Sequence, residues 1–344
     1  MKGRKSLTSL SNIYLKKPFS HIYVENQAFK YDETYRITNF FKNSQLIEVS
    51  DYRNVFNSHN QNFNLQKKTP DLILAVKKGD FLYKGSDLCH GYENMDFYYL
   101  TNIINCLYDC DYCFIRGMYT SANIVYFVNT DDFFDAVAHE ALGKDIFIPI
   151  SYKSDLLVME SIFRIFARWH SFCVENSNVN IEVRTKSSCI NIIKEYRPVR
   201  NILLSWTLSP DLIISSYEKK SPPLQKRIKA VNQALEAGWK VRLSFDPILL
   251  IDDAEKIYTS FFNQILSEIP IDFLFDLNIG FFRMPKTYFR EYKSKTQFSP
   301  VLYSDWEYSA DHVTYSSDRK EKFMKSAEPY LKEFSRLTKV LYMV

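Results

Sequence analysis

Strand-like and helix-like hydrophobic patterns alternate along most of the chain. Short runs of apolar, β-branched and aromatic residues are each followed by a longer stretch in which apolar positions recur at helical spacing. Such units begin at Phe97 to Thr101 and continue over Ile124 to Leu142, Ile146 to Glu175, Val179 to Tyr196, Ile202 to Ala237 and Lys240 to Ser267. Repeated βα units predict a parallel sheet that curls, with functional groups at the carboxyl ends of its strands.

A smaller α/β unit is predicted over residues 20–92. Its strands are expected at His21 to Glu25, Leu46 to Val49 and Leu72 to Val76, with a helix near Asp32 to Lys42. The stretch Asn54 to Lys68 is rich in Asn, Gln and His and is predicted to be a loop. Several lysines make the unit basic, which is typical of a solvated face or of a surface that contacts phosphate. They include Lys67, Lys68, Lys77, Lys78 and Lys84.

The pattern changes after Ile271. A strand-like run from Phe273 to Phe282 leads into residues 283–344, which are predicted to form a C-terminal extension. Within it we expect a hairpin over Asp305 to Thr314, a helix over Arg319 to Arg336 and a closing strand over Lys339 to Met343.

Composition indicates a cytosolic globular protein. Hydrophobic residues make up 46% and charged residues 24% of the chain, and no apolar run approaches the ~18 residues of a membrane span. The net charge of +4 is too small to identify a nucleic-acid binder. Residues 1–19 are basic and lack acids, so a frayed terminus is predicted, with a DNA-contacting arm or a targeting segment as alternatives. Glycine-rich phosphate loops are absent.

Half of the six cysteines lie within eight residues, as Cys106, Cys110 and Cys113 with the spacing C-x3-C-x2-C. Three thiolates can hold three irons of a [4Fe–4S] cluster and leave the fourth open to a small molecule. When that molecule is S-adenosylmethionine (SAM), one electron splits its sulfonium and yields a 5′-deoxyadenosyl radical. The alternatives are a zinc site completed by Cys89 or His90, and three unrelated buried thiols.

Tyr112, just before the third cysteine, completes a pattern that resembles the radical SAM superfamily. Further segments resemble one of its families, spore photoproduct lyase, which repairs a methylene-bridged thymine dimer in spore DNA. They are Ser154-Asp155, Glu182-Val-Arg-Thr-Lys186, Trp206-Thr-Leu-Ser-Pro210, Tyr217-Glu218 with Ser221-Pro222, and Ala237-Gly-Trp-Lys-Val241 leading to Phe245-Asp-Pro-Ile248. The resemblance implies a partial (β/α)6 TIM-type radical SAM barrel over residues 93–282, between the small N-terminal α/β unit and a C-terminal hairpin-helix-strand extension.

The same resemblance assigns the cofactor contacts. The three cysteines bind the cluster, and the positions near SAM are Tyr112, Phe114, Ser154, Lys186 and Thr207. A lysine and hydroxyls can anchor the carboxylate and ribose of SAM while Tyr112 flanks its adenine. From the residues alone, Ser154 could instead cap a helix beginning near Asp155, and Lys186 could be a surface lysine.

The chain also departs from the family pattern. The cysteine that returns a hydrogen atom to the substrate is replaced by Tyr152, and the tyrosine after the third cluster cysteine is replaced by Phe114. The hairpin that enters the DNA lesion carries acids here, which repel phosphates. Contacts with the DNA backbone and with a flipped base are predicted for Lys286, Arg290, Lys293 and Trp306.

The predicted activity is therefore that of a radical SAM carbon–carbon lyase acting on DNA with a pyrimidine lesion. The implied cofactors are a [4Fe–4S] cluster and SAM, and the implied electron source is a one-electron donor such as flavodoxin or ferredoxin. No membrane partner is expected, and the predicted compartment is the cytoplasm. Two alternatives stay open: an Fe–S and SAM binding module without lyase activity, and a radical SAM enzyme acting on another substrate.

Overall fold

A computed structural model of the chain describes residues 19–85, 95–296 and 299–343. Its largest sheet has eight strands in the order β18-β14-β13-β11-β10-β9-β5-β4, and all neighbours are parallel except the edge pair β5 and β4. The strands are β4 (Leu82–Lys84), β5 (Asp96–Leu100), β9 (Ile146–Pro149), β10 (Val179–Thr185), β11 (Ile202–Thr207), β13 (Lys240–Ile248), β14 (Asp276–Phe281) and β18 (Val340–Met343). The predicted C-terminal strand thus pairs with β14 at one edge.

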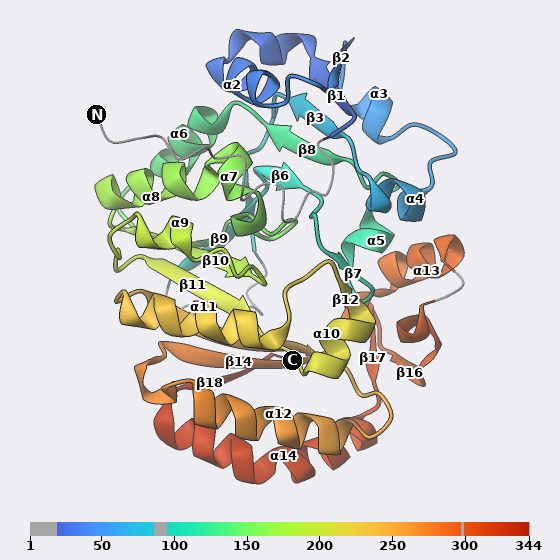
Figure 1. Cartoon of the computed structure of the whole chain (residues 1–344), viewed down its shortest axis with the longest axis vertical. Coiled ribbons are helices and arrows are strands. Elements are labelled where there is room, and N and C mark those ends of the chain that lie inside the picture. The colour runs from blue at the N-terminus through green and yellow to red at the C-terminus, as the bar shows by residue number, and fades with distance from the viewer. Residues whose placement is uncertain (1–18, 86–94, 297–298, 344) are drawn as a thin grey trace.

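Helices cover this sheet because each has an apolar stripe to bury. Helix α8 packs on β10, α11 packs on β13, and the long α14 lies beside α12 (Figure 1). In α11 the apolar stripe includes Leu224, Ile228 and Val231, all buried. The helices of this part are α6 (Thr130–Glu140), α7 (Glu160–Phe163), α8 (Ile165–Glu175), α9 (Asn191–Lys194), α10 (Asp211–Tyr217), α11 (Leu224–Glu236), α12 (Ala254–Glu268) and α14 (Ser317–Leu337). Among the described helices, none has the length and apolar character needed to cross a membrane.

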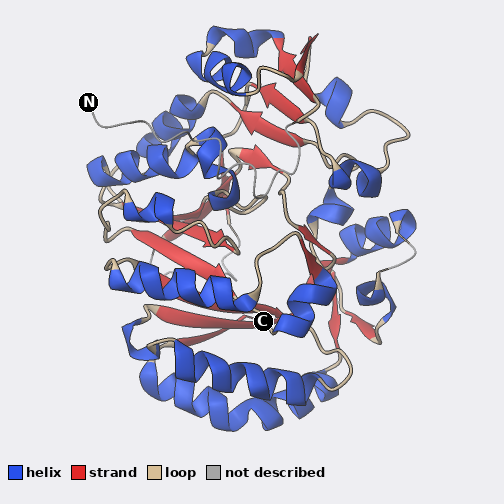
Figure 2. Cartoon of the chain, in the orientation of Figure 1, coloured by secondary structure: helices blue, strands red, loops and turns tan. Residues whose placement is uncertain are grey.

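A second sheet of five strands, in the order β2-β1-β3-β8-β6, forms the N-terminal end of the molecule (Figures 1 and 2). Its strands are β1 (His21–Glu25), β2 (Gln45–Val49), β3 (Leu72–Ala75), β6 (Ile103–Ile104) and β8 (Ile124–Phe127). We expected the strand at Ile124 in the larger sheet, but it pairs in parallel with β3. β3 is fully buried, so its backbone N–H and C=O groups on the side away from β1 cannot bond to water and require a neighbouring strand.

The prediction of a loop over Asn54 to Lys68 is wrong. This stretch contains most of α3 (Arg53–Phe56) and all of α4 (Phe63–Lys68), which follow α2 (Asp32–Phe40). Two aromatic side chains, Phe56 and Phe63, are buried and fix the short helices, and Asn62 Oδ1 caps α4 by accepting from Leu65 N at 3.0 Å. Most of the Asn, Gln and His residues that suggested a loop lie on the solvent-facing side of these short helices and their connection.

The C-terminal extension contains the predicted hairpin. Strands β16 (Trp306–Tyr308) and β17 (His312–Tyr315) are antiparallel, and β15 (Arg283–Pro285) pairs on the other side of β17. Helix α13 (Lys286–Lys295) follows β15 directly. The basic stretch 1–18 and the residues Cys89 and His90 lie outside the described residues.

Candidate cofactor site

A two-stranded ribbon fixes the start of the cysteine loop. Strand β7 (Asp109–Cys110) pairs with the antiparallel β12 (Glu218–Lys219), and Asp111 N donates to Tyr217 O at 2.7 Å. The loop then continues into the short helix α5 (Ile115–Met118). The Tyr217-Glu218 segment is therefore the support on which the middle cysteine is held.

A buried polar cluster locks Tyr112 to the same support. The Tyr112 hydroxyl donates to Glu218 Oε1, and Ser209 Oγ donates to the same oxygen at 2.9 Å. Arg227 Nη2 donates to the other oxygen, Glu218 Oε2, at 2.5 Å. Glu218 is 1% exposed and Arg227 is 0% exposed. Burial disfavours the charged carboxylate, but Arg227, Lys186 and the Tyr112 hydroxyl outweigh it and bring the pKa of Glu218 to about 2. The cluster is therefore ionised at neutral pH.

Two cations satisfy carbonyl groups of the loop. Arg116 Nε donates to Cys110 O at 2.9 Å, while its Nη2 pairs with Asp109. Lys67, on α4, donates its Nζ to Cys106 O. An irregular loop leaves buried carbonyls without regular partners, so these side chains replace the missing backbone donors.

The three loop cysteines are free thiols in a largely apolar setting. Burial raises the pKa of Cys106 to about 11, with Lys67 acting in the opposite direction. Burial raises the pKa of Cys110 further, and here Lys186 opposes it. In both cases the charge of Cys113 also contributes. Cys106 and Cys110 are therefore protonated thiols, which must lose their protons when they bind a metal.

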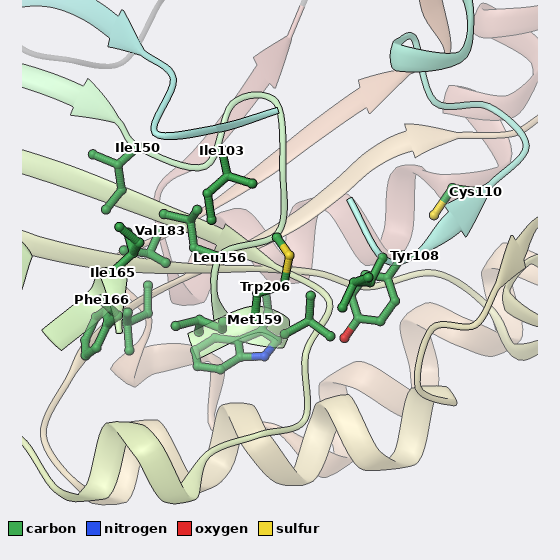
Figure 3. Close-up of a cluster of buried hydrophobic side chains, with 14 of the residues drawn as sticks. Ile103, Tyr108, Cys110, Ile150, Leu156, Met159, Ile165, Phe166, Val183 and Trp206 are labelled. Atoms are coloured by element: carbon green, nitrogen blue, oxygen red, sulfur yellow. The ribbon is translucent and has the colours of Figure 1, made fainter. Parts of the chain in front are cut away.

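Figure 3 shows Tyr108 and Cys110 as members of the buried cluster that also contains Trp206 and Met159. Tyr108 N donates to Cys106 Sγ at 3.4 Å. Hydrogen bonds to sulfur and an apolar shell are the features with which a protein stabilises and tunes an iron–sulfur cluster.

The chemistry of the loop fits a [4Fe–4S] cluster. Cys106, Cys110 and Cys113 are free thiols on one loop, and a [4Fe–4S] cube with three protein ligands would take each thiolate at a different iron. The charges of Lys67 and Lys186 favour the thiolate forms of Cys106 and Cys110 that such a cluster requires.

Asp155, rather than Ser154, provides the local cap. The Asp155 carboxylate accepts from Thr185 Oγ1 at 2.8 Å, from Lys186 N at 2.7 Å and from Val158 N at 3.3 Å. The alternative role of Ser154 as a helix cap is therefore wrong. Ser154 Oγ is shielded from solvent and has no hydrogen-bond partner among the described residues. An orphaned buried hydroxyl is costly unless a ligand satisfies it.

Lys186 lies over the ring of Tyr112, with its Nζ 5.5 Å from the ring centroid. Burial lowers the pKa of Lys186, but Cys110 and Glu218 outweigh it and raise the pKa above its ordinary value. Lys186 is thus a half-buried cation at the cysteine loop rather than a surface lysine. Thr207, the last residue of β11, is buried at the next strand end. The structure brings these predicted contacts to one edge of the sheet.

Tyr152 and Phe114, the two departures from the family pattern, are neighbours. Their ring centroids are 5.6 Å apart. On its other side Tyr152 lies 5.2 Å from the ring of Tyr99, and Phe114 is stacked at 6.5 Å on Tyr288 of α13. Tyr152 is 46% exposed, so it is accessible from solvent beside the cysteine loop.

The four residues predicted to contact nucleic acid belong to the C-terminal extension and are Lys286, Arg290, Lys293 and Trp306. Helix α13, which carries the first three, packs against α5 beside the cysteine loop. The Trp306 ring is held between Phe282 at 4.8 Å and Tyr315 at 4.6 Å, and with Lys293 it lines a surface cavity of about 680 Å³. Its rim also includes Glu307, one of the hairpin acids. This cavity is separate from the cysteine loop.

Sequence reasoning missed the roles of the charged residues that hold the loop, Arg227, Arg116 and Lys67. The expectation of a solvated or phosphate-contacting position is wrong for Lys67, which is 5% exposed and donates to Cys106 O instead. A signal existed for Arg227, which lies among Leu224, Ile228 and Val231 on the apolar stripe of α11. An arginine at a buried helix position needs a carboxylate partner. The partner, Glu218, was visible as part of a motif, but its role was not.

The chain is similar to proteins of one known family. The model of the family described as spore photoproduct lyase matches residues 18–297. The spore photoproduct lyase of Bacillus subtilis (strain 168) is 20% identical over 340 residues, 93% of this chain and 97% of the relative. A solved spore photoproduct lyase complexed with dinucleoside spore photoproduct has a TM-score of 0.79 at 14% identity and covers 94% of this chain and 99% of its own. A double mutant with bound AdoMet and dinucleoside spore photoproduct has a TM-score of 0.80 at 16% identity, with 95% and 100% covered.

The family match and the cysteine spacing together define a radical SAM protein. The chain belongs to the spore photoproduct lyase family. The predicted family, the mixed α/β fold of a partial radical SAM barrel and the class of radical SAM lyase are thereby confirmed.

Proposed function

We propose that this chain repairs a thymine lesion of the spore photoproduct type in DNA. The observation that carries the proposal is the supported cysteine loop, with three free thiols next to the half-buried Lys186 and the orphaned hydroxyl of Ser154. The family match and the dinucleoside spore photoproduct in the solved relatives support the choice of substrate.

The cofactors follow from the same residues. Cys106, Cys110 and Cys113 would hold a [4Fe–4S] cluster, and Ser154, Lys186 and Thr207 would contact SAM. When bound, the reduced cluster and SAM supply a 5′-deoxyadenosyl radical, which is able to remove a hydrogen atom from an unactivated carbon. The electron comes from a small one-electron carrier of the flavodoxin or ferredoxin type.

Positioning in this site depends on charge. Lys186 supplies a permanent cation for a carboxylate, and its own place is set by the Asp155 carboxylate, which accepts from its backbone N–H at 2.7 Å. Glu218 and Arg227 keep the Tyr112 ring fixed beneath that cation. When SAM is bound, these contacts would hold Lys186 in place to orient its carboxylate end.

Tyr152 is the proposed hydrogen donor. Its phenolic O–H gives a hydrogen atom to the thymine radical that forms when the bridge breaks, and a phenoxyl radical remains on Tyr152. One electron from the external donor and one proton from solvent restore the phenol. Phe114, 5.6 Å away, has no hydroxyl with which to accept a hydrogen atom, so it acts as a wall of the site.

Two assays on anaerobically reconstituted protein test the proposal. With SAM and dithionite, a radical SAM enzyme releases 5′-deoxyadenosine; no release above a sample lacking dithionite would contradict the proposal. With dinucleotide spore photoproduct added, restored thymines are expected. Release of 5′-deoxyadenosine without restored thymines would favour the second candidate, a radical SAM enzyme with another substrate, to which the Tyr152 and Phe114 replacements point.

A further inference from the structure

Two lysines that form no ion pair within the described residues lie near Tyr152, outside the cofactor contacts. Lys77 follows β3, where Asn129 fixes its backbone: Lys77 N donates to Asn129 Oδ1 at 2.8 Å and Asn129 Nδ2 donates to Lys77 O at 3.0 Å. Lys153 follows Tyr152 in the loop after β9. Both side chains are half-buried. Each therefore has a defined place, unlike a freely solvated lysine.

Their ammonium groups approach the same region. Lys77 Nζ is 3.2 Å from Tyr83 Oη, and Lys153 Nζ lies 5.9 Å from the centroid of the Tyr119 ring. Burial lowers the pKa of Lys153, and the charge of Lys77 lowers it further. Two like charges that repel each other across a partly desolvated space favour an anion between them.

No acid of the described residues neutralises this pair. The neighbouring Lys78 pairs with Glu25 at 3.6 Å, whereas Lys77 donates to Lys78 O and to the Tyr83 hydroxyl. Lys153 has a ring contact but forms no ion pair within the described chain. Within the described chain, neither lysine of this pair therefore has its charge balanced by a carboxylate.

Tyrosines surround the lysine pair. Lys153 Nζ lies over the ring of Tyr119, and burial raises the pKa of this phenol above its ordinary value. In addition, the rings of Tyr83 and Tyr99 stack at 5.4 Å, and Tyr99 lies 5.2 Å from Tyr152. Aromatic rings beside cations are the elements with which proteins bind single-stranded nucleic acid: the cations hold phosphate and the rings stack on bases.

We infer that Lys77 and Lys153 together bind one backbone phosphate of single-stranded DNA next to the lesion, with a neighbouring base against the Tyr99 and Tyr152 rings. This deepens the proposed function, on which it rests. The inferred phosphate site lies at the N-terminal sheet and in the loop after β9. It is distinct from the DNA contacts predicted in the C-terminal extension. The phosphate would fix the strand so that the lesion meets Tyr152.

The test measures binding of a fluorescent octathymidylate to the holoenzyme by anisotropy over a range of salt concentrations. K77Q and K153Q are each expected to weaken binding about tenfold and to reduce the salt slope by about 0.7, the value for one phosphate contact on a single strand. Because one phosphate is shared, the double variant should lose little more than either single variant. K153R should restore binding, since it retains the charge and rules out a general loss of structure.

Lys229, exposed on the outer face of α11, gives the matched control, and K229Q should bind like the unchanged protein. Equal losses in K229Q and K153Q, or full binding by the double variant, would overturn the inference. Release of 5′-deoxyadenosine by the unchanged protein needs no DNA, so it reports on the proposed function separately. If that release occurs while the lysine variants bind normally, only the phosphate site is refuted.

Discussion

Replacing Glu218 with glutamine tests whether a buried ion pair supports the cysteine loop. The substitution keeps the size of the side chain but leaves Arg227, which is 0% exposed, without its counter-charge. The pKa of Glu218 is about 2 instead of the ordinary 4.5, a difference equivalent to about 3 kcal/mol of folding free energy. Breaking a buried ion pair by removing one partner costs a similar amount, about 3–5 kcal/mol.

The sign of the pH dependence follows from the lowered pKa. A carboxylate with a depressed pKa stabilises the folded state above its unfolded pKa of about 4.5, and this contribution is lost as the pH falls toward 2. We therefore expect the E218Q variant to be less stable by about 3 kcal/mol at pH 7. Because glutamine does not titrate, the stability of E218Q should also fall less steeply than that of the unchanged protein as the pH drops from about 4.5 toward 2.

Thermal and urea unfolding of the metal-free protein measure the effect. At about 2.1 cal/mol/K per residue, 344 residues have an unfolding entropy near 0.7 kcal/mol/K, so the midpoint temperature should fall by about 4 °C. Glu333 pairs with Arg336 on the exposed face of α14, and E333Q is the control, with an expected loss below about 0.5 kcal/mol. Equal losses in E218Q and E333Q would refute the reasoning.

Three further predictions concern separate contacts. In G117A the added Cβ would meet Tyr288 O at 1.9 Å, so α5 and α13 must separate. We expect the free energy of unfolding to fall by about 1–3 kcal/mol and iron retention to weaken. An unchanged melting temperature would contradict this packing. Burial raises the pKa of Glu160 from 4.5 to about 7, so stability should fall by about 3 kcal/mol as the pH rises through that interval, and E160Q should show a flat profile there by urea titration. Tyr152→Phe should abolish thymine restoration while 5′-deoxyadenosine is still released, and Tyr152→Cys should retain restoration; repair by the phenylalanine variant would exclude Tyr152 as the hydrogen donor.

Much of the candidate site could be read from the sequence because its chemistry is local. The spacing of Cys106, Cys110 and Cys113 needs no tertiary information, since the ligands of the predicted cluster lie on one loop. The positions of Ser154 and Lys186 could be predicted as well, because parallel strands bring their carboxyl ends to one edge. The role of Ser154 could not be predicted from the sequence. Whether Ser154 or Asp155 caps the following turn depends on which side-chain oxygen faces the N–H groups of Val158 and Lys186 in the fold.

By itself, the sequence determined the βα alternation, the cysteine loop and the family resemblance, because hydrophobic period and ligand spacing are properties of short segments. Only the tertiary structure decided that β8 joins β3, that Glu218 and Arg227 support Tyr112, and that Lys77 contacts Tyr83, whose ring stacks on Tyr99 next to Tyr152. Each of these depends on which surfaces distant segments bury against one another. Burial turns an ordinary carboxylate or lysine into a residue that requires a partner, and the partner is chosen by the fold.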